Sequence, residues 1–194
     1  MRVHDLNLPI SDQRIEDLQI GDTVYLNGVV CTARDMAHLK IKRLLEDGKP
    51  LPVTCKGGAV IHAGPVIIKE GGKWRLSVIG PTTSIRMEPY AAMVAALGVK
   101  ILVGKGGMAA ASAREFARHK QVYLQAPPGC AVLLANGVKE VLDVFGLENG
   151  MPEAMWVLKV EKFGPLVVTM DARGQSLYDE LRGSADRVIA EMQM

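Results

Sequence analysis

The feature that most constrains the fold is an alternation of apolar strands and alanine-rich helices between residues 80 and 125. The segment MEPYAAMVAAL predicts a helix that stops at Gly98, and the apolar strand Val99–Val103 follows it. A glycine-rich loop then leads into a second helix, about Met108–His119, and a second strand, Val122–Gln125. Two successive strand–loop–helix units are typical of parallel βαβ folds. The chain is therefore predicted to be an α/β protein with a partly parallel sheet.

The rest of the chain predicts more strands and helices around this unit. Residues 1–20 are interpreted as an N-terminal arm or an early helix, and residues 176–194 as a C-terminal helix. A length of 194 residues with 48% apolar residues fits one domain with a substantial core. One compact domain over residues 1–194, with mixed sheets and βαβ units, is expected. Its further strands are predicted at 23–30, 59–61, 66–69, 74–79, 138–145, 155–163 and 166–171, and its further helices at 35–47 and 131–136.

Charge and composition exclude several classes of partner. The 23 basic and 21 acidic residues nearly balance and form no basic run, so no nucleic-acid-binding face is expected. No apolar run reaches about 18 residues, and the first residues lack the apolar centre of a signal peptide, so no membrane association is predicted. The three cysteines, an odd number at wide spacing, argue against a disulfide framework. A cytoplasmic protein whose cysteines are small buried side chains is the simplest interpretation.

Two loops between a strand and a helix have the composition of anion-binding sites. In Gly80–Arg86, threonine and serine hydroxyls precede a helix, and Arg86 offers a planar guanidinium suited to a carboxylate. In Val103–Met108, glycines permit a close backbone approach and Lys105 adds a point charge. Each loop alone is also explained as a helix cap or a tight turn, and neither has the spacing of a nucleotide-binding motif. Because both are expected to leave parallel strands at their carboxyl ends and to open helices, together they predict an anion site.

A third loop has a similar position between a strand and a helix. In CTARDMAH, Asp35 is suited to cap the helix, and Arg34 either faces the same pocket or pairs with Asp35. His38 lies about one helical turn further along and shares their face. A lone histidine is more often a structural hydrogen-bond partner than a catalyst, and the same ambiguity applies to His62. Asp35 and His38 are therefore predicted to support the site.

Six sequence blocks, taken in order, resemble one known family. From about Ile20 to about Leu181 the chain is similar to the β subunit, or C-terminal domain, of class I fumarases and L-tartrate dehydratases. The pair GPTTSIRM and VGKGGM is the most specific part of this resemblance. It implies a swivelling β/β/α domain with three layers. The six blocks are VxxTARDMAH, GGAVIHAGP, GPTTSIRM, VGKGGM, PPGCAVL and GMPEAMWVLKVEKFGPLVV.

The resemblance also implies a reaction and a partner. Family members add or remove water at a 2-hydroxy dicarboxylate, and the open iron of a 4Fe-4S cluster acts as a Lewis acid on the substrate hydroxyl. The cluster cysteines belong to the other subunit, so a hetero-oligomer with a cluster-bearing α subunit is expected and no metal ligand in this chain. In agreement, Cys31, Cys55 and Cys130 lie 24 and 75 residues apart and form no compact ligand pair.

Carried over motif by motif, the resemblance implies roles for five residues. Arg34 and Arg86 would bind the substrate carboxylates, with Arg86 also counted as catalytic. Thr83 would hydrogen-bond the substrate, and Lys105 would complete the pocket. Thr82 matches the position proposed as the base that removes the carbon-bound proton, a role that needs a charged neighbour because a free threonine is a poor base. Two arginines, a lysine and two helix N-termini are suited to neutralise a dicarboxylate.

The substrate and the function class stay open at this point. TARD stands where many fumarases have TGRD, and Ile61–His62–Ala63 stands where they often have a tyrosine pair. Hydration of fumarate to L-malate is the first candidate reaction, dehydration of L-tartrate to oxaloacetate the second, and a methylated relative such as mesaconate the third. Two other classes remain: a non-catalytic module that binds a small anion or nucleotide, and a subunit that only stabilises its partner.

Overall fold

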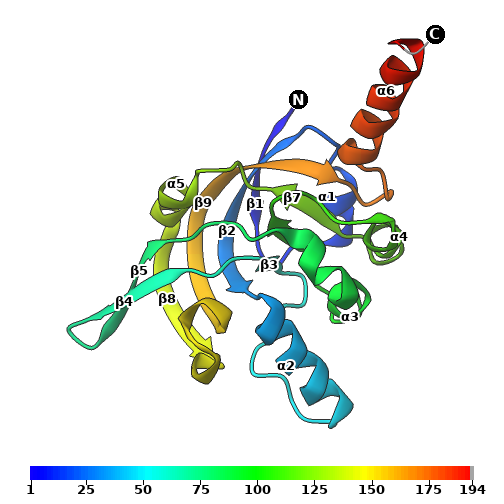
Figure 1. Ribbon diagram of the computed structural model, residues 1–194. Helices are drawn as coiled ribbons and strands as arrows, with labels where there is room; N and C mark the ends of the chain where they lie inside the picture. Colours follow the sequence, from blue (N-terminus) through cyan, green and yellow to red (C-terminus); the bar gives the residue numbers. More distant parts are fainter. Residues whose placement is uncertain (193–194) are drawn as a thin grey trace.

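The body of the protein is a seven-stranded mixed sheet, described over residues 1–192 by a computed structural model (Figure 1). Its strands are β1 (Val3–Asn7), β2 (Thr23–Thr32), β3 (Ala59–Ile61), β6 (Ile101–Gly104), β7 (Val122–Gln125), β8 (Val138–Phe145) and β9 (Met155–Met170). Strands β1, β2, β3, β6 and β7 run parallel in this order. Strand β9 runs antiparallel to β7, to β8 and to β2. Because β9 pairs with both β7 and β2, the sheet closes on itself through β2, β3, β6, β7 and β9.

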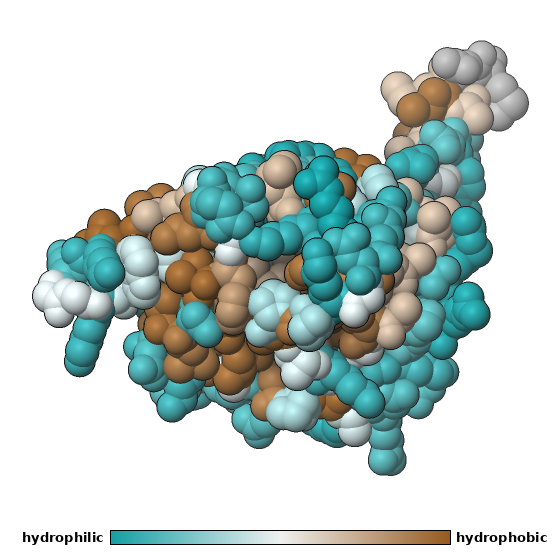
Figure 2. Space-filling model, turned by 90° about the horizontal axis from the view of Figure 1, so that it is seen from below, coloured by the Kyte–Doolittle hydropathy of each residue, from teal (hydrophilic) through white to brown (hydrophobic). Residues whose placement is uncertain are grey.

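Three helices cover one face of this sheet: α2 (Asp35–Glu46), α3 (Ala91–Ala96) and α4 (Ala110–His119). In Figure 1 the β4–β5 hairpin projects on one side, and the last helix leaves the body on another. Figure 2 shows hydrophobic residues gathered beside the hairpin on the face seen from below. The other elements are α1 (Asp12–Glu16), β4 (Val66–Glu70), β5 (Lys73–Val78), α5 (Ala131–Asn136), α6 (Leu177–Met192) and the 3-10 helices η1 (Ser84–Tyr90), η2 (Leu147–Asn149) and η3 (Met151–Glu153).

The central strands are buried on both faces, which explains why their sequences are uniformly apolar. In β6, Ile101 and Val103 point into the cluster on the face away from α2, α3 and α4, together with Trp156. Leu102 points the opposite way, into the cluster that contains Phe116 of α4. This alternation follows from the two-residue period of a strand. Two hydrophobic layers therefore hold the strand ends, and the loops that leave them, in place.

The predicted mixed α/β architecture is confirmed. The helix expected at 35–47 is α2, and the unit β6–α4–β7 has parallel strands, with Ile101 opposite Val122. The helix expected at 131–136 is α5. The tail helix is present over Leu177–Met192, and the last two residues of that expectation lie outside the described residues. Of the helices formed by residues 1–192, none is long and apolar enough to cross a membrane.

Two predicted boundaries are wrong. Residues 3–7, expected in an arm or an early helix, form β1 and pair in parallel with β2, while only Asp12–Glu16 is helical. Leu6 is the single buried residue of β1, so the strand carries almost no hydrophobic signal. The two strands expected at 155–163 and 166–171 are one strand of 16 residues, β9. A register shift opposite β2 carries the strand past Pro165, since a bulge accommodates a residue without an N–H group.

Candidate functional site

Backbone hydrogen bonds hold Thr82, Thr83 and Lys105 together at one edge of the sheet. The N–H of Thr82 donates to the carbonyl of His62 at 2.6 Å, and the N–H of Lys105 donates to the carbonyl of Thr82 at 3.3 Å. The N–H of Ser84 donates in turn to the carbonyl of Lys105 at 3.0 Å. Residues 82–84 thus extend the sheet beside the carboxyl ends of β3 and β6. The expectation that their loop leaves a parallel strand is wrong, because it follows β5, which belongs to an antiparallel hairpin.

Two ion pairs position the arginines of the neighbouring loops. Arg86, in η1, pairs with the carboxylate of Asp35 at the start of α2. Arg34 pairs with Glu153 of η3, with Nη2 and Oε1 3.0 Å apart, and the other oxygen of Glu153 accepts the N–H of Met36 at 3.1 Å. Of the two alternatives for Arg34, pairing with Asp35 is therefore not the one observed. Asp35 supports Arg86 instead, and Glu153 is a partner that the sequence analysis missed.

Arg34 lies in a close-fitting position. A methyl group added at Gly64 would stand 2.7 Å from Nη1 of Arg34, so the arginine occupies the space that a side chain there would take. Its Nε is buried and has no hydrogen-bond partner among the described residues. An unpaired buried donor is costly, which is unusual for a residue with a purely structural role. Nε of Arg34 is thus a buried donor that no described residue satisfies, while Nη2 is held by Glu153.

His38 supports Arg34 through the backbone. Its ring is buried, and Nδ1 lies 2.8 Å from the carbonyl oxygen of Arg34, so Nδ1 carries the proton and donates. The ring stacks on Tyr90 at 5.3 Å and meets the edge of the His62 ring at 5.6 Å. Burial lowers the pKa of His38 below its usual 6.5, although the bond to Arg34 opposes the shift. His38 is thus a neutral ring that fixes the backbone preceding α2.

A buried polar network supports the loop that carries Thr82 and Thr83, called the threonine loop below. Oγ of Ser84 lies 2.9 Å from Nδ1 of His62 and accepts the hydroxyl of Tyr123 at 2.9 Å. Burial lowers the pKa of His62 well below 6.5, and the nearby His38 adds to the effect. Burial also raises the pKa of Tyr123. Gly104 has no space for a side chain, because an added methyl group would stand 1.9 Å from Oγ of Ser84. The network is therefore neutral and closely packed.

The helix N-termini contribute less than the sequence analysis expected. The segment after Thr83 begins as the 3-10 helix η1, and α3 starts only at Ala91. The N-terminus of α4 already carries an anion, because Glu88 accepts the N–H of Ala109 at 2.9 Å and both the N–H and the hydroxyl of Ser112, at 2.9 and 2.7 Å. The N-terminus of α4 is therefore not open to a ligand as expected, and the other predicted helix begins as a 3-10 helix. What remains is a set of cationic and hydroxyl side chains.

These side chains lie at an open edge of the molecule. Arg86, Thr83 and Lys105 are exposed, whereas Thr82 and Arg34 are half-buried. Guanidinium groups bind carboxylates with two parallel hydrogen bonds, and an ammonium group and hydroxyls add charge and directional bonds. The arrangement is therefore suited to an anion with carboxylate groups.

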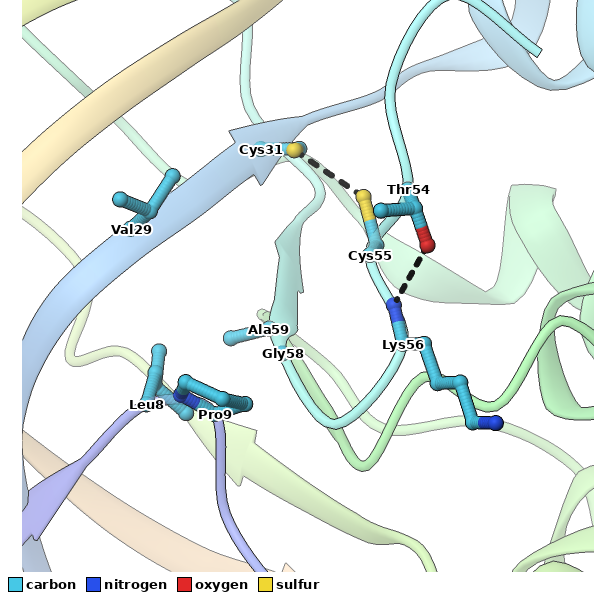
Figure 3. Close-up of a pocket in the computed structure, with 9 residues that line it drawn as sticks. All are labelled: Leu8, Pro9, Val29, Cys31, Thr54, Cys55, Lys56, Gly58 and Ala59. Atoms are coloured by element: carbon cyan, nitrogen blue, oxygen red, sulfur yellow. Dashed lines mark hydrogen bonds between the residues drawn. The ribbon is translucent and has the colours of Figure 1, made fainter.

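The cysteines do not form a cluster site. Sγ of Cys31 and Sγ of Cys55 are 3.0 Å apart (Figure 3), and both side chains belong to the hydrophobic layer under α2 and α3. Cys130 packs against the layer on the other face. Over residues 1–192, no three His, Cys, Asp or Glu side chains are grouped so as to hold a metal ion. A 4Fe-4S cluster with three thiolate ligands therefore does not fit the described part of this chain.

Fold and site together define an α/β protein that presents arginine, lysine and threonine side chains at one edge of its sheet. The Fumarase C-terminus family model matches residues 1–181, and the chain belongs to this family, as the sequence blocks indicated.

Individual relatives agree with this assignment. The chain is 42% identical to the L(+)-tartrate dehydratase subunit beta of Escherichia coli (strain K12) over 176 residues, which cover 90% of this chain and 86% of the relative. It is 44% identical to the putative L(+)-tartrate dehydratase subunit beta of Methanocaldococcus jannaschii over 174 residues, 89% of each chain. It is 40% identical to the putative fumarate hydratase class I of Geobacillus stearothermophilus over 186 residues, 95% of this chain but 35% of that longer protein.

Proposed function

We propose that this chain is the β subunit of an iron–sulfur hydro-lyase and that it binds the carboxylates of a 2-hydroxy dicarboxylate substrate. The observation that carries the proposal is the convergence of Arg34, Arg86, Thr83 and Lys105 at one edge of the sheet, through the backbone bonds and ion pairs described above. The guanidinium and ammonium donors at this edge are suited to bind the carboxylates of such a substrate by charge-assisted hydrogen bonds. The family and the names of the relatives support the same reaction class.

Each arginine keeps donors for the substrate while its acidic partner holds it in place. A guanidinium has five N–H donors, and the ion pairs with Asp35 and Glu153 use only part of them. We propose that Arg86 and Arg34 each bind one substrate carboxylate, that Thr83 hydrogen-bonds the substrate and that Lys105 completes the pocket. Positioning of this kind lowers the barrier by orienting the reacting groups before the chemical step.

Thr82 is proposed as the residue nearest to the proton transfer. Its backbone is held on both sides, because its N–H donates to the carbonyl of His62 and its carbonyl accepts the N–H of Lys105. A threonine hydroxyl is a weak base and needs a charged neighbour to accept a proton from carbon. We propose that the partner subunit supplies this neighbour.

The remainder of the proposal concerns the partner. We propose that the cluster-bearing α subunit covers the open edge in a hetero-oligomer in the cytoplasm, and that the cluster is held there. The gathering of hydrophobic residues on the surface in Figure 2 supports a contact with another protein, since large exposed apolar areas mark such contacts. We also propose that residues 1–194 form one domain, with the three-layer swivelling β/β/α arrangement that the family resemblance implies.

L-tartrate is the substrate favoured by the relatives of matching length, which are named for it. Fumarate and L-malate, the first candidates from the sequence blocks, are supported by the longer relative, which is named as a putative fumarate hydratase class I. All three acids carry two carboxylates, with two hydroxyls between them in L-tartrate, one in L-malate and a double bond in fumarate. Only turnover distinguishes them.

The test is to combine this chain with its α subunit under anaerobic conditions, reconstitute iron and sulfide, and follow L-tartrate and L-malate dehydration side by side. Turnover that requires both chains is expected, and the faster acid identifies the substrate. Failure with both acids, while the cluster spectrum is intact, contradicts the proposal. Binding of a nucleotide or phosphate by this chain alone, in the micromolar range, favours the binding-module alternative instead.

A further inference from the structure

A pair of thiols lines an open cavity outside the proposed substrate site. Cys31 is the second-last residue of β2, and Cys55 lies in the turn that precedes β3. Their sulfur atoms are 3.0 Å apart and face each other at the cavity wall (Figure 3). The cavity has a volume of about 220 Å³ and is also lined by Pro9, Val29 and Lys56. A small oxidant can therefore reach the pair from solvent.

The backbone brings the two cysteines together. Cys31 stands opposite Val60 in the parallel pairing of β2 with β3, and Gly58 donates to the carbonyl of Cys55 at 2.8 Å, which folds the turn back toward β2. Disulfide sulfurs are about 2.05 Å apart, so the two thiols need to approach by only about 1 Å. Both cysteines are free in this structure. The juxtaposition is a consequence of tertiary structure, because the two residues are 24 positions apart in the chain.

The two thiols differ in a way that suits a nucleophile and a resolving thiol. Both cysteines border the cavity, but Cys55 is half-buried whereas Cys31 is only 3% exposed. The hydrogen bond between the thiols lowers the pKa of Cys55, and together with burial it raises the pKa of Cys31. The thiolate is the reactive form of cysteine, so Cys55 is the thiol that reacts first.

We propose that Cys31 and Cys55 form a redox-active dithiol that a hydroperoxide oxidises to an intramolecular disulfide. The Cys55 thiolate attacks one oxygen of hydrogen peroxide, the O–O bond breaks, and hydroxide leaves, so that Cys55 becomes a sulfenic acid. The proton that Cys55 released on ionising converts this hydroxide to water. The sulfur of Cys31 then attacks the sulfur of Cys55, the S–O bond breaks, and the departing hydroxide takes up the proton of Cys31. Two thiols are oxidised by two electrons, and one peroxide is reduced to two waters.

The two thiols also lie near the loop that carries Arg34. Cys31 precedes Arg34 by three residues, and a second, smaller cavity of about 50 Å³ is lined by both Cys55 and His38. His38 holds the carbonyl of Arg34. Drawing Cys55 toward Cys31 removes packing beside His38, so the disulfide is expected to lower turnover of the complex. This second part rests on the proposed function, whereas formation of the disulfide does not.

The first experiment treats the reduced chain alone with hydrogen peroxide at a few-fold molar excess. The expected result is loss of two of the three thiols, a mass decrease of two hydrogen atoms, and a peptide map that links residues 31 and 55. Cys130→Ser is the matched control and should give the same cross-link. Cys31→Ala should leave a sulfenic acid on Cys55, which a dimedone adduct reveals by mass. A cross-link that involves Cys130, a link between two chains, or independent oxidation of each cysteine overturns the proposal.

The second experiment separates the effect on this chain from damage to the cluster. The chain is oxidised alone, freed of peroxide, and then mixed with untreated α subunit. Turnover several-fold below that of the reduced chain, restored by a thiol reductant, is expected, and Cys55→Ser should abolish the difference. Equal turnover of the oxidised and reduced chains overturns the coupling to Arg34. Absence of turnover even with the reduced chain contradicts the proposed function, while the cross-linking result of the first experiment still decides the dithiol.

Discussion

The carboxylate of Asp35 forms an ion pair with the guanidinium of Arg86, although the two residues lie 51 positions apart in the chain. Each belongs to a different loop of the candidate site, so the pair sets the distance between the start of α2 and η1. Arg86 is 48% exposed, and at such exposure an ion pair adds little to the stability of the fold. Its effect is therefore on position: Asp35 presents Arg86 at the open edge with free donors toward a ligand.

Replacement of Arg86 is expected to remove most turnover of the complex without unfolding the chain. Arg86→Ala should lower kcat/KM of the complex on the order of 100-fold or more, because a carboxylate would lose a charge-assisted hydrogen-bond partner. Arg86→Lys should restore little, since an ammonium cannot make the bidentate contact. The measurement is kcat/KM, with circular dichroism to confirm the fold. Arg75→Ala, which removes an exposed ion pair in the hairpin, is the matched control. Near-normal turnover of Arg86→Ala contradicts the role.

Glu88 is expected to stabilise the loop that carries Lys105. Its carboxylate accepts three hydrogen bonds, from Ala109 and Ser112 at the start of α4. Glu88→Ala should lower the free energy of unfolding by about 2 kcal/mol, because the helix loses its cap. Urea unfolding measures the change. Glu140→Ala, at an exposed position of β8, should stay within about 0.5 kcal/mol of the parent chain. Equal effects of the two substitutions refute the assignment.

Stability is expected to fall in mildly acidic solution because two histidines are buried in neutral form. Burial lowers the pKa of both His38 and His62 below 6.5. Below pH 6.5 the unfolded chain then binds more protons than the folded chain. The stability that the folded chain gains by keeping these histidines neutral is therefore complete above pH 6.5 and is lost as the pH falls. Urea unfolding at pH 7.5, 6.5 and 5.5 measures the slope. His62→Gln should give a flatter slope over this range, and an unchanged slope rejects the explanation.

Gly104 is expected to tolerate no side chain. An added methyl group would stand 1.9 Å from Oγ of Ser84 and 3.1 Å from the hydroxyl of Tyr123. Gly104→Ala should therefore destabilise the protein by about 1–3 kcal/mol and displace the threonine loop. Differential scanning fluorimetry gives the stability, and kcat/KM of the complex reports the loop. Gly183→Ala is a suitable control, because nothing lies within 4 Å of the added methyl group and alanine favours the helix. A stable and active Gly104→Ala protein contradicts this account.

Much of the fold was predictable because its signals are local. The buried strands β6 and β7 have short apolar runs, and α2 and α4 have periodic apolar faces, so their residues report both type and position. The strand β1 was not predicted because only Leu6 is buried in it. The strand β9 was predicted as two strands because Gly164–Pro165 resembles a break and the bulge opposite β2 has no sequence signal. The segment MEPYAAMVAAL was predicted as one regular helix, but its first residues belong to the 3-10 helix η1, and Pro89 lies inside that 3-10 helix.

The sequence by itself determined the family, the α/β class and the motif residues Arg34, Thr82, Thr83, Arg86 and Lys105, because these depend on residue identity and short-range order. Only the tertiary structure decided which groups meet. It paired Arg86 with Asp35 and Arg34 with Glu153. It also placed the carboxylate of Glu88 at the N-terminus of α4 and the sulfur of Cys31 3.0 Å from that of Cys55. The physical reason is that side-chain partners are selected by the packing of whole strands and helices, and packing joins positions that no local pattern relates.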